Sequence, residues 1–230
     1  FREGIDGEAV DWAVARLGGG VQWVNLLYGS VLMWGTVVFC RRQPWPWLAL
    51  LVAVPYLLIV VGMGYSRQAM ALGFALVGLT ALGEHRVRVC VVCIALGALF
   101  HKSAVLLLPI AVLANSRNRF LTAGMVGATF VLLYFLLLAE DADALWTNYV
   151  EYQMQSQGAK IRVLMNAVPA LLMLLYGKRL APDRQERRLW TIIALLALLC
   201  LPLVSLASTA VDRVALYLIP LQLFVFARIP

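Results

Sequence analysis

The sequence predicts an all-α, polytopic integral membrane protein with about seven to nine membrane helices. First, 63% of the 230 residues are hydrophobic and only 13% are charged, whereas an ordinary soluble domain is roughly 45–50% apolar. Second, apolar runs of about 17–20 residues recur, and each can cross a hydrocarbon core about 30 Å thick as a helix. The runs lack the alternation of polar and apolar residues that a β-barrel needs, so spanning helices are favoured.

Eight apolar segments follow one another along the chain. They cover about residues 21–40, 45–63, 67–83, 87–114, 120–139, 161–177, 189–207 and 213–227. The connectors are too short to hold a soluble domain, so residues 21–230 are expected to form one helical transmembrane domain. Residues 1–20 begin with neither an initiator methionine nor a signal peptide. They are expected to be an external loop, the end of a longer one.

The positive charge of the chain indicates its orientation in the membrane. The formal net charge is +7, but the Lys and Arg residues lie in short connectors rather than on one soluble face, which argues against nucleic acid as a partner. Basic residues gather in cytoplasmic loops of membrane proteins. Arg41 with Arg42, Arg86 with Arg88, and the cluster from Lys178 to Arg188 therefore mark cytoplasmic connectors. The acidic stretches Glu3–Asp11 and Glu140–Glu151 are expected outside.

The segment 87–114 departs from simple alternation because arginines flank both of its ends. Such a segment must turn back, and Phe100-His101-Lys102-Ser103 is the polar point where it can do so. The two halves reach roughly 21 Å and 17 Å, too short for a full crossing. We therefore predict a re-entrant or broken helix pair at 87–114. Polar backbone at that depth needs protein or water around it, so a wet cavity open to the outside is expected.

Five basic residues fall at the predicted outer ends of helices, where the charge rule disfavours them: Arg67, Lys102, Lys160, Arg162 and Arg213. Charges at the membrane edge indicate a functional site, and a pyrophosphate suits arginine forks and lysine point charges. Ser66 and Ser103 are interpreted as N-caps whose helices direct positive dipole ends into the same cavity. The alternative is that these side chains only reach toward lipid headgroups.

Other polar residues carry weaker signals. His101 lies in the recessed turn, where it could position a substrate or move a proton. Tyr149 lies in an outer loop rich in aromatic and amide side chains, which either bind sugar rings or form an interfacial helix. The spacing Cys90-Val-Val-Cys93 has no matching second pair, and Asp141-Ala-Asp143 is too short a motif to assign. Neither a metal nor a cofactor is therefore expected.

Two motifs about thirty residues apart carry a family resemblance. They are Gly64-Tyr65-Ser66-Arg67-Gln68-Ala69-Met70-Ala71 and Leu99-Phe100-His101-Lys102-Ser103-Ala104. Further similarity runs through Asp6–Asn25, Gly158–Arg162 and Asp212–Tyr217. With these motifs the chain resembles the EpsG family of Wzy-type polysaccharide polymerases over most of its length.

The resemblance implies an enzyme of the bacterial inner (cytoplasmic) membrane whose active site faces the periplasm or exterior. It would transfer a growing glycan from undecaprenyl pyrophosphate onto the next lipid-linked repeat unit, among membrane lipids and beside a flippase and a chain-length regulator. Together with the residue patterns above, the resemblance gives catalytic roles to His101, Arg67 and Arg213. It gives substrate-binding roles to Lys102, Gln68, Ser103 and Tyr217, and the residue patterns add Arg162 and Tyr149. The alternatives are a lipid-linked-sugar glycosyltransferase or O-antigen ligase, or a transporter or flippase of anionic lipid-linked sugars.

Overall fold

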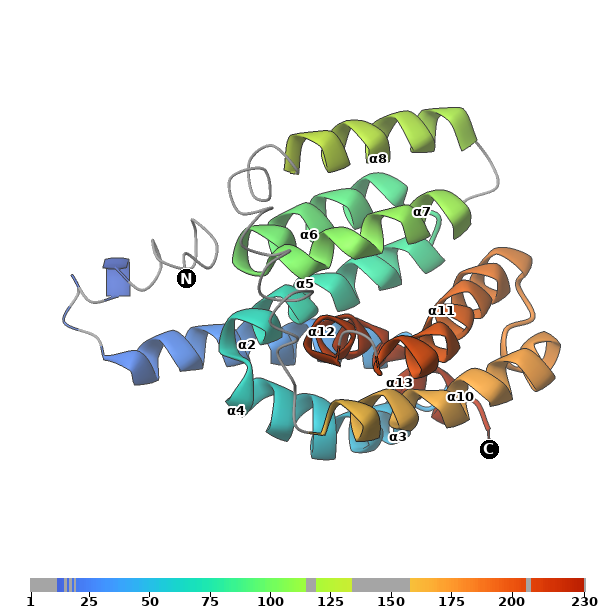
Figure 1. Cartoon of the computed structure of the whole chain (residues 1–230), viewed down its shortest axis with the longest axis horizontal. Helices are drawn as coiled ribbons and strands as arrows, with labels where there is room; N and C mark the ends of the chain where they lie inside the picture. The colour runs from blue at the N-terminus through green and yellow to red at the C-terminus, as the bar shows by residue number, and fades with distance from the viewer. Residues whose placement is uncertain are drawn as a thin grey trace.

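The computed structural model of the chain describes residues 12–14, 16, 18, 20–114, 119–133, 158–205 and 208–229. Within these ranges all regular structure is helical, so the predicted all-α fold is confirmed there (Figure 1). Three helices are long and apolar enough to cross a membrane, namely Val21–Cys40, Pro46–Gly64 and Ala159–Leu180, and one bent pair could make a fourth. The chain is therefore a membrane protein, and the number of seven to nine spans stays a prediction.

The helices follow the predicted segments closely at the start of the chain and less closely at its end. They are α2 (Val21–Cys40), α3 (Pro46–Ala53), the π-helix η1 (Val54–Val61), α4 (Gly62–Gly64), α5 (Ser66–Gly83), α6 (Val87–Phe100), the 3-10 helix η2 (Lys102–Leu107), α7 (Leu108–Ala114), α8 (Arg119–Leu133), α10 (Ala159–Leu180), α11 (Arg184–Leu203), α12 (Ser208–Leu218) and α13 (Pro220–Phe226). The part of the predicted segment 120–139 beyond residue 133 lies outside the described residues.

Two helix boundaries near the C-terminus differ from the prediction for local reasons. Helix α11 begins at Arg184, because the Asp183 carboxylate accepts hydrogen bonds from the backbone N–H groups of Gln185 and Glu186 at 2.9 and 2.8 Å. Such a cap allows a charged first turn to stay helical before the apolar stretch begins. The predicted segment 213–227 is two helices that bend by 46° near Pro220, a residue that has no N–H to continue a helix.

The predicted segment 87–114 is broken at His101, as expected, and its re-entrant path through the membrane stays a prediction. Helix α6 ends at Phe100, and His101 has an extended backbone with φ −148° and ψ 111°. Helix η2 follows, and α7 packs back against α6 (Figure 1). The end of α6 is fixed because the Phe100 ring packs edge-on against Tyr28 and stacks with Phe74, at centroid distances of 6.2 and 6.3 Å.

The two predicted serine caps are wrong. Ser66 is the first residue of α5 itself, and the capping position belongs to Tyr65, whose side chain makes no cap hydrogen bond. Ser103 lies inside η2, and the α-helical turn begins only at Leu108. A predicted cap is correct only if the helix begins at the next residue. Helix α5 begins one residue earlier than this at Ser66, and the α-helix after Ser103 begins several residues later.

Helix α5 lies between α2 and α6 and packs closely against both (Figure 1). Small residues permit this contact: a Cβ on Gly35 would lie 2.2 Å from the carbonyl oxygen of Gly73, and a Cβ on Gly73 would lie 2.5 Å from that of Val31. On the other face, a Cβ on Gly97 would lie 3.0 Å from the carbonyl oxygen of Ala71. Helix backbones approach this closely in membrane proteins only through such residues. The crossing therefore sets where the first residues of α5 lie.

We expect Gly73→Ala to destabilise the protein. The added methyl group would meet the Val31 carbonyl at 2.5 Å, and backbone atoms cannot move aside as a flexible side chain can, so the helices must separate. Overpacking of this kind typically costs about 1–3 kcal/mol. The apparent melting temperature of the detergent-purified protein should fall. The control Gly83→Ala, where nothing lies within 4 Å of the new Cβ, should leave it unchanged, and equal melting of both variants would contradict the assigned helix contact.

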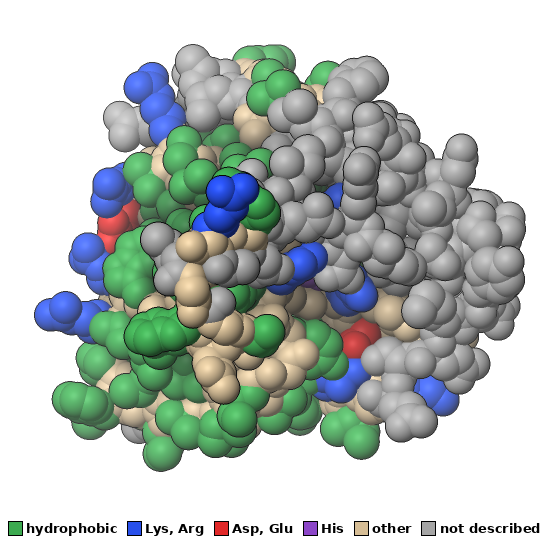
Figure 2. Space-filling view, turned by 90° about the vertical axis from the view of Figure 1, so that its left-hand side faces the viewer, with side chains coloured by type: hydrophobic (Ala, Val, Ile, Leu, Met, Phe, Trp, Pro, Cys, Tyr) green, Lys and Arg blue, Asp and Glu red, His purple; other side chains and the backbone are tan. Residues whose placement is uncertain are grey.

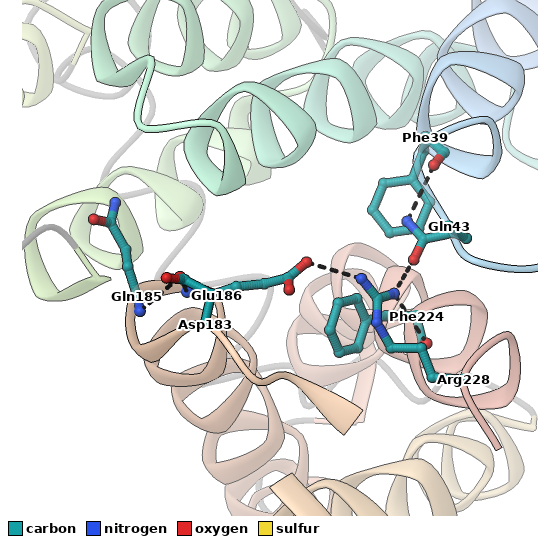
Figure 3. Close-up of polar contacts among 7 residues, drawn as sticks. All are labelled: Phe39, Gln43, Asp183, Gln185, Glu186, Phe224 and Arg228. Atoms are coloured by element: carbon teal, nitrogen blue, oxygen red, sulfur yellow. Dashed lines mark hydrogen bonds and ion pairs between the residues drawn. The ribbon is translucent and has the colours of Figure 1, made fainter. Parts of the chain in front are cut away.

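A cluster of polar side chains lies near the C-terminus (Figure 3). The Arg228 guanidinium donates hydrogen bonds to Gln43 and, at 2.9 Å, to the Glu186 carboxylate, and it lies 3.6 Å from the centre of the Phe224 ring. Gln43 in turn donates to the Phe39 carbonyl at 3.1 Å. Burial raises the pKa of Glu186 and lowers that of Arg228, and their mutual attraction opposes both shifts. We name Gln43, Glu186 and Arg228 the Arg228 clasp.

Candidate active site

The start of α5, the break after α6, the first turn of α10 and the helix α12 meet at the end of the molecule away from the Arg228 clasp. They supply seven polar residues: Arg67, Gln68, His101, Arg162, Asp212, Arg213 and Tyr217. Figure 2 views the left-hand side of Figure 1 and shows Lys and Arg side chains beside an acidic one on this face, next to residues that are not described. Segments separated by more than a hundred residues thus build one site.

His101 lies between two side chains of α12. Its Nε2 is 3.3 Å from Nη1 of Arg213, and its Nδ1 is 3.4 Å from the hydroxyl oxygen of Tyr217. Arg213 and Tyr217 are four residues apart in α12, so they share one helical face. The Tyr217 side chain is only 2% exposed. The extended backbone at His101 therefore presents the imidazole ring to α12, which a continuous helix would not do.

Gln68 connects the first motif to the segment Asp212–Tyr217. Its Nε2 donates to the backbone carbonyl of Arg213 at 2.9 Å, and its side chain is buried. A buried amide needs such a partner to offset its desolvation. The bond fixes the position of the Arg213 backbone relative to the start of α5. There the half-buried Arg67 precedes Gln68. The first motif and the segment Asp212–Tyr217 are therefore in direct contact.

Arg162 forms a two-pronged ion pair with Asp212. Its Nε contacts one carboxylate oxygen of Asp212, and its Nη2 lies 2.5 Å from the other. Asp212 is 2% exposed, so this ion pair offsets part of the cost of burying its carboxylate. Gly158 begins α10 with φ +82°, a conformation that glycine adopts without strain. Arg162 lies one turn into α10, and the pair ties α10 to α12 beside Arg213.

Tyr56 borders the same pair. It lies in the π-helix η1 and interacts electrostatically with Arg162 and Asp212. Its hydroxyl oxygen is buried beside the Arg162 guanidinium. π-Helical segments within longer helices are frequently found at functional sites. Tyr56 therefore belongs to the wall of this site.

Two buried amide side chains, Asn166 and Gln222, connect α10 to α12 and α13. Asn166 donates to the carbonyl of Ala215 at 2.9 Å and accepts from Nε2 of Gln222 at 2.7 Å. Asn166 is 1% exposed and Gln222 is 7% exposed. Satisfied networks of this kind fix a single arrangement of the helices around them. They support α12 on the side where its helix bends into α13.

The predicted site residues have different outcomes. His101, Arg213, Tyr217 and Gln68 are brought into contact, and Arg162 is paired with Asp212. Lys102 and Ser103 follow His101 in η2 and are half-buried, whereas Lys160 is exposed at the start of α10. Tyr149 lies outside the described residues, as does Asp141-Ala-Asp143. Among the described residues, no group of three His, Cys, Asp or Glu side chains could hold a metal ion.

Sequence reasoning missed Asp212, Asn166, Gln222 and Tyr56. The signal for the first three was present, because a carboxylate or amide inside an apolar helix requires a polar partner. Asp212 has a basic neighbour in the sequence, but its structural partner is the distant Arg162. Nothing in the sequence around Tyr56 indicates a π-helix.

This arrangement defines a class: a helical membrane protein in which arginines and a histidine from distant helices form one polar site at one end. The EpsG family matches residues 9–230. The chain therefore belongs to the EpsG family, a family of Wzy-like polysaccharide polymerases. No curated protein matches the chain, and no solved structure does.

Proposed function

We propose that the protein is a glycan polymerase that transfers an oligosaccharide chain from undecaprenyl pyrophosphate onto the next lipid-linked repeat unit, at the outer face of the bacterial cytoplasmic membrane. The observation that carries this proposal is His101 held between Arg213 and Tyr217 at a break in an apolar helix pair. It combines a group able to accept a proton with a group able to bind phosphate. Membership of the EpsG family supports the polymerase role.

The reaction joins two sugars and releases a lipid diphosphate. A hydroxyl oxygen of the acceptor repeat unit bonds to the anomeric carbon of the donor, and the bond from that carbon to the diphosphate oxygen breaks. The electron pair leaves with the diphosphate, and the hydroxyl proton passes to Nε2 of His101. Negative charge grows on the leaving group, so preorganised donors lower the barrier most. We assign Arg213, Arg67 and Lys102 to the diphosphate, and Ser103 and Tyr149 to the sugars.

Gln68 and Tyr217 act through other residues in this proposal, whereas Arg162 both holds α12 and contacts the substrate. Asp212 occupies Nε and Nη2 of Arg162, so Arg162 serves first to hold α12 and reaches the substrate from that position. Gln68 positions the backbone of Arg213. Tyr217 orients the His101 ring.

The proposed orientation places the site outside and the Arg228 clasp in the cytoplasm, with seven to nine spans and residues 1–20 external. Two features support it. The connectors near the clasp are rich in basic residues, and there Glu84 pairs with Arg42 at 2.9 Å and with Arg86 at 3.6 Å. Helix α6 has 14 residues, roughly 21 Å long, so the 87–114 pair fits a re-entrant element. The partners in the cell would be membrane lipids, a flippase and a chain-length regulator.

The direct test is product analysis with the protein in vesicles and a lipid-linked repeat unit as the only sugar substrate. We expect a ladder of glycan lengths and one released lipid diphosphate per new linkage. A ligase would instead require a different acceptor and give no ladder. A transporter would move the unit between leaflets without making a linkage. Absence of linkages in vesicles that hold folded protein would overturn the polymerase assignment.

A further inference from the structure

The contact between Arg213 and His101 fixes which ring nitrogen carries the proton. A guanidinium has only N–H donors and no acceptor. Its Nη1 lies 3.3 Å from Nε2 of His101, so a hydrogen bond between them requires a bare lone pair on Nε2. The proton of the neutral ring must then be on Nδ1.

Tyr217 completes this assignment from the other side of the ring. Its hydroxyl oxygen lies 3.4 Å from Nδ1 and can accept the Nδ1–H. The hydroxyl group is buried, so solvent does not compete for that bond. Arg213 and Tyr217 together select one of the two neutral tautomers. A doubly protonated ring would place an N–H group against the guanidinium N–H groups, which removes the bond.

The same contact covers the nitrogen that the proposed reaction needs. The lone pair that takes the acceptor's proton is the one that Arg213 occupies in this structure. The main chain of Arg213 is held by Gln68, so its side chain can swing while α12 stays in place. A diphosphate accepts bidentate hydrogen bonds from a guanidinium, and these are stronger than a bond to a neutral imidazole.

We propose that Arg213 couples donor binding to base activation: the lipid diphosphate draws Arg213 off His101, and only then is Nε2 open to the acceptor hydroxyl, with Tyr217 as the positioning residue that keeps the proton on Nδ1. The inference rests on the proposed function. It implies an ordered reaction in which the donor binds before the acceptor is deprotonated. In the resting protein the histidine is covered, which limits attack by stray hydroxyl groups, including water.

Nitrogen-15 NMR of the imidazole ring tests this directly. The chain has two histidines, so His85→Asn leaves His101 as the single labelled ring. In the resting protein we expect the Nδ1–H tautomer with a hydrogen-bonded Nε2. Geranylgeranyl pyrophosphate, used as the probe, should move the Nε2 signal downfield as its hydrogen bond is lost, and geranylgeraniol should not. Arg213→Met should show the downfield position without ligand, and Tyr217→Phe should shift population to the Nε2–H tautomer.

Three results would overturn the inference: a resting Nε2–H tautomer, an unmoved signal when binding of radiolabelled probe is saturated, or the same probe-induced shift in Arg213→Met as in the parent. The spectra need no turnover, so this outcome is separate from that of the product analysis. If the protein polymerises but the probe does not shift the His101 signal, the proposed function stands and the proposed coupling is wrong. The parent and both variants are compared after size-exclusion chromatography, so misfolded protein is removed.

Discussion

Replacing His101 with alanine is expected to abolish polymer while leaving the protein folded and inserted. The ring lies between Arg213 and Tyr217, and a positioned proton acceptor contributes about 10²–10⁴-fold to rate. Single repeat units should then accumulate on their carrier in the outer leaflet, because another protein exports them. A membrane-impermeant sugar oxidant added to intact cells measures which leaflet holds them.

The matched control for this experiment is the second histidine. His85 is exposed and has φ +63°, a conformation that asparagine tolerates better than most residues. His85→Asn should therefore polymerise at the parental rate. Accumulation of the repeat units in the inner leaflet of the His101→Ala strain would indicate a transporter and overturn the polymerase assignment.

Removing one partner of the Arg162–Asp212 pair is expected to destabilise the protein strongly. Arg162→Met would leave the Asp212 carboxylate, which is 2% exposed, without its ion-pair partner, and breaking a buried pair in this way costs about 3–5 kcal/mol. Asp212→Leu should have a similar effect from the other side. The double variant removes both charges and should recover most of the stability. Apparent melting temperatures of the four proteins form a double-mutant cycle that measures the coupling.

The double variant also tests the role of Arg162. If Arg162 only positions α12, polymer synthesis should return with stability. If its guanidinium touches the substrate, the double variant should be stable and inactive. Additive losses of stability in the cycle would mean that the pair contributes nothing beyond its separate residues, and would contradict the coupling that the geometry predicts.

The sequence predicted those features that depend on local pattern. Apolar length located most helices within a few residues, and the arginines that flank 87–114 located a helix break at His101 without any structural information. The start of α11 at Arg184 and the bend near Pro220 were missed, because the first depends on a cap and the second on a proline rather than on hydropathy. The pairing of Arg162 with Asp212 was also missed. Fifty residues separate the two, and no periodic pattern encodes which distant helices lie beside each other.

The Gln68 contact shows the same limit from the other direction. The family resemblance marked Gln68 as substrate-binding, whereas in the structure its side chain donates to the backbone carbonyl of Arg213. Spacing within a segment is fixed by helix geometry. Contact between segments depends on close packing such as that of Gly35 on Gly73, and a single sequence does not express it.

The Arg228 clasp has a consequence for any cycle of alternating access. A carrier must open toward the cytoplasm once per turnover, and in the orientation proposed above that would separate Arg228 from Gln43 and Glu186 and withdraw its guanidinium from the Phe224 ring. Separating these partly buried groups breaks their hydrogen bonds and their ion pair, which disfavours a state open on that side. An enzyme whose substrates both arrive from the outer leaflet does not need to separate these groups. For such an enzyme, a closed inner end keeps the membrane impermeable while the outer site works.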